Sequence, residues 1–260
     1  MTEYEKYLFD LQGYLVVPEA LSPSQVAALN KILDQRIEAD MAPEATNHRF
    51  GHLLDWGRPY LDLVFNPKVS DYLAEIIDPR FRLDHVYLDI IRAGLSPIGA
   101  HLHGGGTPFN FSNYFLYKDA RFQCGLTVVA YNLHDVNPGD GGFACVPGSH
   151  KANFAYPDEW KHLASLPPEA ESLVRDVTGP AGTAVIFTEA LTHGPLPWTA
   201  RQERRTIFYK YNNHASSWAA DGFDASRYDG LDERQREILE SPNARYPKRE
   251  SSTRAGGARR

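Results

Sequence analysis

The spacing of apolar residues changes near residue 80, and this change constrains the fold more than any other feature of the chain. Before it, apolar residues recur at the three-and-four spacing of helices. After it come short runs rich in β-branched and aromatic residues, separated by Gly, Pro, Asn or Asp, at 82–93, 121–133, 141–148, 183–190 and 204–212. Short strands after N-terminal helices predict a mainly β fold, a jelly roll or double-stranded β-helix with a helical buttress.

The N-terminal part carries clear helix and turn signals. Ser22 is suited to cap a helix, with Pro23 at its first position and an apolar stripe through residue 37. A strand should end at Pro18. We expect further helical segments at 3–11, 67–77 and 156–173.

A chain of this length can bury one sizeable core, so we expect a single domain over 1–240. Residues 241–260 lack apolar side chains to bury and are predicted to form a disordered tail. The formal net charge of −6 disfavours polymeric nucleic acid and anionic membranes as partners. Neither a signal peptide nor a membrane-spanning run is apparent, and both cysteines lie in apolar runs, which favours a cytoplasmic protein.

Histidine placement is the most informative chemical signal. Neutral imidazole is the commonest nitrogen ligand for iron, and few of the ten histidines lie at strand ends. His101 and His103 stand beside three glycines in PIGAHLHGGGTPF, and His193 directly follows a predicted strand in FTEALTHGPLPW.

Three segments resemble phytanoyl-CoA hydroxylase-like oxygenases, which use iron(II) and 2-oxoglutarate. They are GYLVVPEALSPSQVAAL, DVNPGDGGFACVPGSHK and THGPLPWTARQERRTIFYKY, and the likeness spans roughly residues 8–212. The most specific parts are the GDGGF…PGSHK segment and a histidine followed eleven positions later by an arginine.

The resemblance implies roles for particular residues. His193 matches the distal iron ligand of the family, and Arg204 matches the arginine that holds the far carboxylate of 2-oxoglutarate. Arg201 and Arg205 compete for that role, but neighbouring residues of a strand point to opposite faces. Tyr131 matches an aromatic position beside the cosubstrate.

The chain departs from the family at the proximal motif, which is usually His-x-Asp. With His103 as the ligand, the residue two positions on is Gly105. This resembles the His-x-Gly or His-x-Ala pattern of iron/2-oxoglutarate halogenases, in which chloride takes the place of the carboxylate. The resemblance therefore implies iron(II), 2-oxoglutarate, dioxygen and chloride as cofactors, with His103 and His193 as metal ligands. It also implies that Gly105 is the catalytic position, where the missing carboxylate leaves room for chloride.

Two other functions stay open. The chain is a hydroxylase if His101, water or a remote carboxylate completes the coordination of the iron. A catalytically inert jelly roll that binds a small ligand is the other alternative, although such a module needs no 2-oxoglutarate clamp. The expected substrate is a free small molecule, with a nucleotide as the best single guess because Arg58, Arg121 and Arg205 could meet a phosphate.

Overall fold

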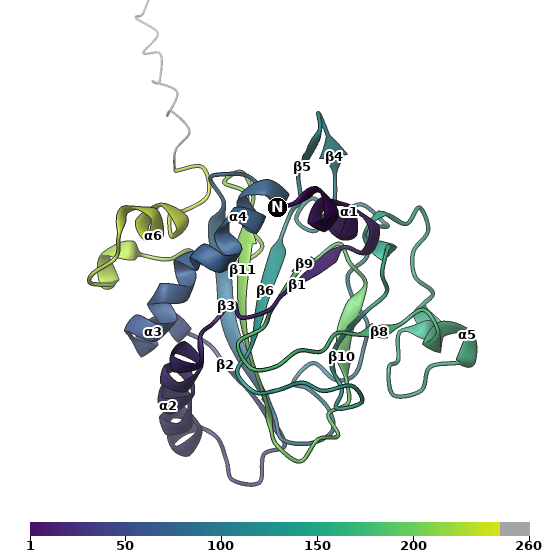
Figure 1. Ribbon diagram of the computed structural model, residues 1–260, viewed down its shortest axis with the longest axis horizontal. Coiled ribbons are helices and arrows are strands. Elements are labelled where there is room, and N and C mark those ends of the chain that lie inside the picture. Colours follow the sequence, from purple (N-terminus) through teal and green to yellow (C-terminus); the bar gives the residue numbers. More distant parts are fainter. Residues whose placement is uncertain (245–260) are drawn as a thin grey trace, which may run out of the picture.

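A six-stranded antiparallel sheet forms the larger wall of the molecule, in the order β1-β9-β6-β11-β3-β2 (Figure 1). The computed structural model describes residues 1–244, so the predicted tail lies outside the described residues from 245 on. The strands of this sheet are β1 (Tyr14–Val17), β2 (Asn47–Phe50), β3 (Arg82–Ile91), β6 (Thr127–Asn132), β9 (Ala184–Thr188) and β11 (Arg204–Asn212).

A three-stranded sheet in the order β10-β7-β8 forms the second wall. Its strands are β7 (Gly142–Cys145), β8 (Arg175–Asp176) and β10 (His193–Leu196), and a separate hairpin joins β4 (Tyr117–Lys118) to β5 (Arg121–Phe122). The predicted strand at 121–133 is thus divided into β5 and β6, and β2, β4, β8 and β10 are additions to the expected set. The architecture is the expected mainly β jelly roll.

Helices cover the outer face of the larger sheet (Figure 1). Ser22 caps α2 through a reciprocal pair of hydrogen bonds with Gln25, as its sequence context predicts. The expected helix at 156–173 is mostly irregular, because only α5 and a short 3₁₀ turn form there. The helices are α1 (Glu3–Gln12), α2 (Pro23–Asp40), α3 (Arg58–Leu61), α4 (Pro67–Ile76), α5 (Pro168–Glu171) and α6 (Glu233–Ile238).

The two faces of the larger sheet bury different clusters. On β11, Ile207 and Tyr209 pack beneath the helices, whereas Phe208 faces the smaller sheet. Between the sheets, Phe208 shares an apolar cluster with Phe143 and Phe187. This alternation decides which polar side chains of β3, β9 and β11 point into the space between the sheets.

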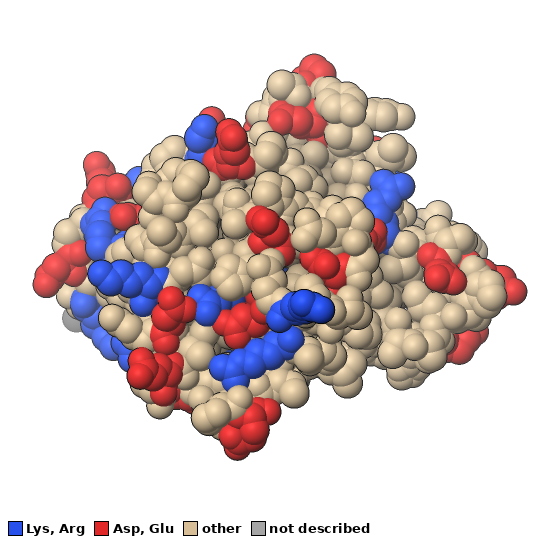
Figure 2. All heavy atoms as spheres, turned by 60° about the horizontal axis from the view of Figure 1, so that its bottom comes forward, with Lys and Arg blue, Asp and Glu red and all other residues tan. Residues whose placement is uncertain are grey.

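Charged side chains lie on the surface without a continuous basic area on the face shown in Figure 2, where Lys and Arg stand among Asp and Glu. Among residues 1–244, no helix combines the length and the apolar character needed to cross a bilayer.

Candidate metal centre

His103 and His193 are held side by side by their own backbones. The amide of His103 donates to the carbonyl of His193 at 2.8 Å, and the amide of His193 donates back to the carbonyl of His103 at 2.9 Å. Their ring centroids are 4.2 Å apart. The segment that carries His103 therefore extends the smaller sheet beside β10.

Both imidazoles direct Nδ1 toward a backbone carbonyl. His193 Nδ1 lies 2.7 Å from the carbonyl of Leu191, and His103 Nδ1 lies 3.4 Å from the carbonyl of His101. Because a carbonyl only accepts, Nδ1 must carry the proton, which leaves Nε2 with a free lone pair. Burial lowers the pKa of His193 to about 3 and also lowers the pKa of His103, so both rings are neutral, the form that binds metals.

Glu189 lies against the two histidines. Its Oε2 is 3.9 Å from His193 Nε2, and the ligand atoms of His103, Glu189 and His193 all lie within 4.8 Å of one another. Its Oε1 accepts a 2.6 Å hydrogen bond from the buried Lys210 Nζ. Burial alone would raise the pKa of Glu189, but the Lys210 ammonium holds it at about 2, so the carboxylate is ionised.

Arg204 is buried in the same cleft and is only 3% exposed. Its Nε has no hydrogen-bond partner, and burial lowers the pKa of its guanidinium to about 10. A buried guanidinium without a partner is costly unless it meets an anion. Arg205 points to the opposite face, where it pairs with Glu203 and Asp34.

Aromatic rings and one ion pair complete the cleft. Arg49 binds both oxygens of Asp89, through Nε at 2.7 Å and Nη2 at 2.8 Å. The Arg49 guanidinium also lies over the ring of Tyr87, 4.1 Å from its centroid. The aromatic side chains that line the cleft are Tyr87, Phe143, Phe187 and Phe208.

Tyr131 does not reach this cleft. Its side chain packs in the cluster beneath the helices, where the hydroxyl lies 3.3 Å from Asn66 Nδ2 and the ring meets Tyr209 edge-on. The structure therefore does not place Tyr131 beside the cosubstrate. His101 is exposed, and its ring lies 5.1 Å from that of His162, outside the His103–Glu189–His193 group.

Gly105 lines a separate cleft with Thr192 and Tyr156. Its φ of +114° lies in a region that L side chains rarely adopt, and a Cβ built there would lie 3.1 Å from Thr192 Oγ1. Residue 105 is thus poorly placed to carry a side chain.

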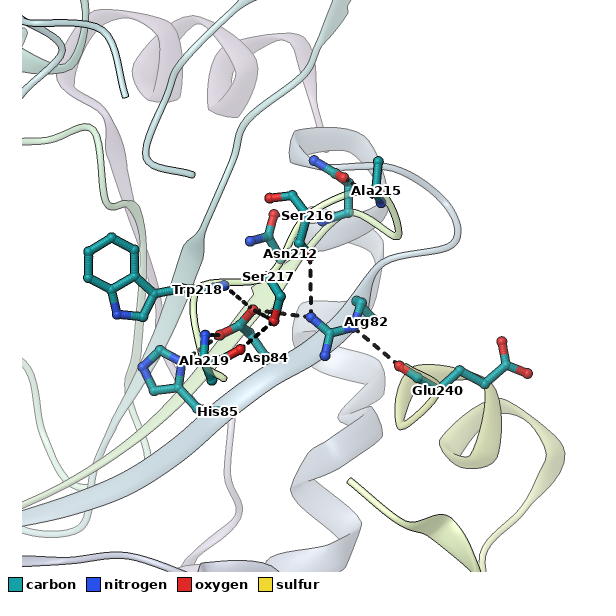
Figure 3. Close-up of polar contacts among 11 residues, drawn as sticks. Arg82, Asp84, His85, Asn212, Ala215, Ser216, Ser217, Trp218, Ala219 and Glu240 are labelled. Atoms are coloured by element: carbon teal, nitrogen blue, oxygen red, sulfur yellow. Dashed lines mark hydrogen bonds and ion pairs between the residues drawn. The ribbon is translucent and has the colours of Figure 1, made fainter. Parts of the chain in front are cut away.

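A polar network ties a later segment of the chain to β3, the strand that carries Tyr87 (Figure 3). Burial alone would raise the pKa of Asp84, but His85 and two backbone amides hold it at about 2. His85 lies at the pocket side, stacked toward Tyr87 with 6.1 Å between centroids. The donors to Asp84 are Arg82 Nη1, His85 Nδ1, Ser217 Oγ and the amides of Trp218 and Ala219.

Residues 95–206 match the model of the phytanoyl-CoA dioxygenase family, and this match includes His103, His193 and Arg204. This part of the chain is similar to the phytanoyl-CoA dioxygenase family. The family is one of iron(II)- and 2-oxoglutarate-dependent oxygenases. No significant match is found among curated proteins.

Three solved structures illustrate the fold that this chain shares. HygX from Streptomyces hygroscopicus, with nickel and 2-oxoglutarate bound, has 22% identity and a TM-score of 0.73, over 84% of this chain and 89% of that one. AviO1 from Streptomyces viridochromogenes has 19% identity and a TM-score of 0.59, over 82% and 95%. SnoK, an α-ketoglutarate-dependent carbocyclase of nogalamycin biosynthesis, has 18% identity and a TM-score of 0.60, over 88% and 91%.

Glu189 and Lys210 did not stand out in the sequence. Each is a charge within an apolar strand segment, FTEA and IFYKY, and two opposite charges in buried strands signal a pair. The alternation of Val185, Phe187 and Glu189 would also have placed the carboxylate on the inner face.

Proposed function

We propose that this chain is an iron(II)- and 2-oxoglutarate-dependent oxygenase that oxidises a C–H bond of a small organic molecule. The observation that carries this proposal is a cleft that holds both a pair of neutral histidines, with free Nε2 atoms, and the buried Arg204, whose Nε has no hydrogen-bond partner. The donor set fits a divalent iron, and the guanidinium fits a carboxylate.

Each residue has a distinct task. His103 and His193 hold the metal, and the carbonyls that accept from their Nδ1 atoms fix the orientation of the rings. Arg204 binds the far carboxylate of 2-oxoglutarate, and Phe143 and Phe187 keep water from that part of the cleft. When bound, iron(II) supplies the activation of dioxygen, in which 2-oxoglutarate becomes succinate and carbon dioxide and one oxygen atom enters the substrate.

The experiment is anaerobic addition of iron(II) and 2-oxoglutarate, followed by dioxygen and a metabolite mixture. We expect a visible absorption band from the ternary complex, and succinate formation that rises with substrate. His193→Ala should lose the band and all turnover, since one nitrogen ligand is removed. His101→Ala is the matched control, because the ring at 101 lies outside the metal group, and it should retain both. Normal succinate production by His193→Ala would contradict the proposal.

Halogenation is the second candidate, and Gly105 is the observation that favours it. The position two residues after His103 has no side chain, so the sequence lacks the carboxylate of the His-x-Asp pattern, and chloride of the same charge could replace that carboxylate at the metal. The balanced reaction converts R–H, chloride, dioxygen and 2-oxoglutarate into R–Cl, hydroxide, succinate and carbon dioxide. A chlorinated product whose yield depends on added chloride would establish this outcome.

A nucleotide substrate is not supported by the arginines that suggested it. Arg58 contacts Gly230 and Asp62, Arg205 lies on the opposite face of β11, and Arg121 lies on the β4–β5 hairpin. None of the three lines the cleft of the histidines. The lining instead favours an organic molecule with an apolar or ring portion to pack against Tyr87 and Phe208. A structure of HygX contains hygromycin B, also a small molecule.

A further inference from the structure

We propose that Glu189 is the third protein ligand of the metal and supplies the carboxylate that Gly105 lacks. This inference rests on the proposed function, because it concerns the same metal. It differs from the His-x-Asp pattern, in which the carboxylate follows the proximal histidine. Here the carboxylate comes from the end of β9, four residues before the distal histidine.

The backbone fixes the direction of the Glu189 side chain. Its amide donates to the carbonyl of Leu126 at 2.9 Å, which continues the pairing of β9 with β6 one residue beyond the strand. Glu189 thereby keeps the inward direction of Phe187, whose ring centroid lies 4.7 Å from that of His193. At 5% exposure, the carboxylate cannot be satisfied by solvent.

The two oxygens of Glu189 have different surroundings. Oε1 is held by Lys210 Nζ at 2.6 Å, whereas Oε2 faces the free Nε2 of His193 at 3.9 Å. A ligating carboxylate commonly binds the metal through one oxygen and a neighbouring donor through the other. Lys210, 9% exposed, therefore orients the carboxylate and leaves one oxygen for the metal.

The carboxylate that lines the cleft, Asp89, is already occupied. Asp89 accepts hydrogen bonds from Arg49 at both of its oxygens. Glu189 alone forms a group with the two histidines in which all three ligand atoms lie within 4.8 Å, among the residues that the structure describes. Two imidazoles and one carboxylate form the ligand set typical of iron(II) oxygenases.

Coordination by Glu189 would limit which small ligands can reach the metal. With Glu189 as a ligand, two histidines and one carboxylate would hold the metal, and its remaining positions would be needed for 2-oxoglutarate and dioxygen. No position then remains for chloride. The ligand set thus selects oxygenation over halogenation.

The test compares variants that both lack the ion pair and differ only in the carboxylate. Lys210→Met keeps Glu189, whereas Glu189→Gln/Lys210→Met removes both charges together, which preserves the fold better than one unpaired buried charge. Cobalt(II) binding in the presence of 2-oxoglutarate, measured anaerobically by calorimetry and visible absorption, needs no turnover. Wild type should bind cobalt(II). Lys210→Met should bind it about 10- to 100-fold more weakly, because Glu189 loses the donor that orients it, and the double variant, which has no carboxylate at this position, should bind it more weakly still.

Chloride gives an independent measurement. Glu189→Ala opens a position at the metal, so its cobalt(II) spectrum should change with added chloride, whereas the wild-type spectrum should not. Equal cobalt(II) affinity in Lys210→Met and the double variant would overturn the assignment of Glu189, as would a chloride response in wild type. If the wild-type protein binds neither cobalt(II) nor 2-oxoglutarate, the proposed function itself is overturned.

Discussion

Replacing Arg204 with methionine should stabilise the ligand-free protein and abolish its response to 2-oxoglutarate. Burial lowers the pKa of the guanidinium from its ordinary value to about 10, which corresponds to about 3 kcal/mol of unfavourable free energy for the buried charge. Because the folded value is the lower one, this cost is present at every pH below about 10 and is relieved only above it. Methionine has a similar length and no charge.

The stabilisation expected for Arg204→Met is measurable by thermal denaturation. For a protein of this size, about 1 kcal/mol shifts Tm by about 2–4 °C, so Arg204→Met should raise Tm by several degrees and by no more than about 12 °C. With cobalt(II) present, 2-oxoglutarate at 100 times its Kd should stabilise wild type by about 2.7 kcal/mol. The variant should show none of this gain, because the carboxylate of the cosubstrate loses its partner.

Arg205→Met is the matched control. Arg205 pairs with Glu203 and Asp34 on the opposite face of β11, so its loss should lower Tm while the response to 2-oxoglutarate remains. A lower Tm in Arg204→Met together with a normal response to 2-oxoglutarate would refute the reasoning. If Arg205→Met alone loses the response, the cosubstrate binds on the other face.

Three further predictions concern stability. Gly105→Asp should lower the free energy of unfolding by about 1–3 kcal/mol, because φ is +114° at this residue. It should not raise the affinity for cobalt(II). Tighter cobalt(II) binding at unchanged Tm would place residue 105 at the metal. Burial lowers the pKa of His150 to about 4, below its ordinary value, so stability should fall as pH drops from about 6.5 to 4. His150→Gln should make the fall in the denaturant midpoint shallower without removing it, because the pKa values of His193 and His103 are also lowered. An equally steep fall in the variant would exclude a contribution from His150. Asp84→Asn should lower the free energy of unfolding by about 3–5 kcal/mol, because it leaves the buried Arg82 without its carboxylate partner. Asp224→Asn, at an exposed position, should lower it far less in the same urea titration. Equal losses in the two variants would contradict this account.

The parts of the fold that were predictable carry their signal within a few residues. Ser22 and Pro23 define the start of α2 because capping is a local interaction. The inward direction of Arg204 relative to Arg205 is predictable as an alternation, although the choice between the two needed the resemblance to a family. The strands after residue 80 were recognisable for the same local reason.

The parts that were not predictable depend on which face of a strand is inward. All six residues of β6 are buried, so its sequence contains no alternation of polar and apolar residues to show where Tyr131 points. Likewise, Glu189 and Lys210 are 21 positions apart and meet only through the pairing of β9 and β11 with β6. Such contacts between strands are a property of the sheet order, which composition and spacing do not determine.

The reciprocal hydrogen bonds between His103 and His193 also bear on amide hydrogen exchange. Each amide is protected by the carbonyl of the other residue, so neither can exchange unless the segments separate. The two amides should therefore exchange at closely similar rates, as one opening unit. Their common rate would report the integrity of the centre in protein that contains no metal, and a variant that loosens this strand contact would be recognised before any assay of turnover.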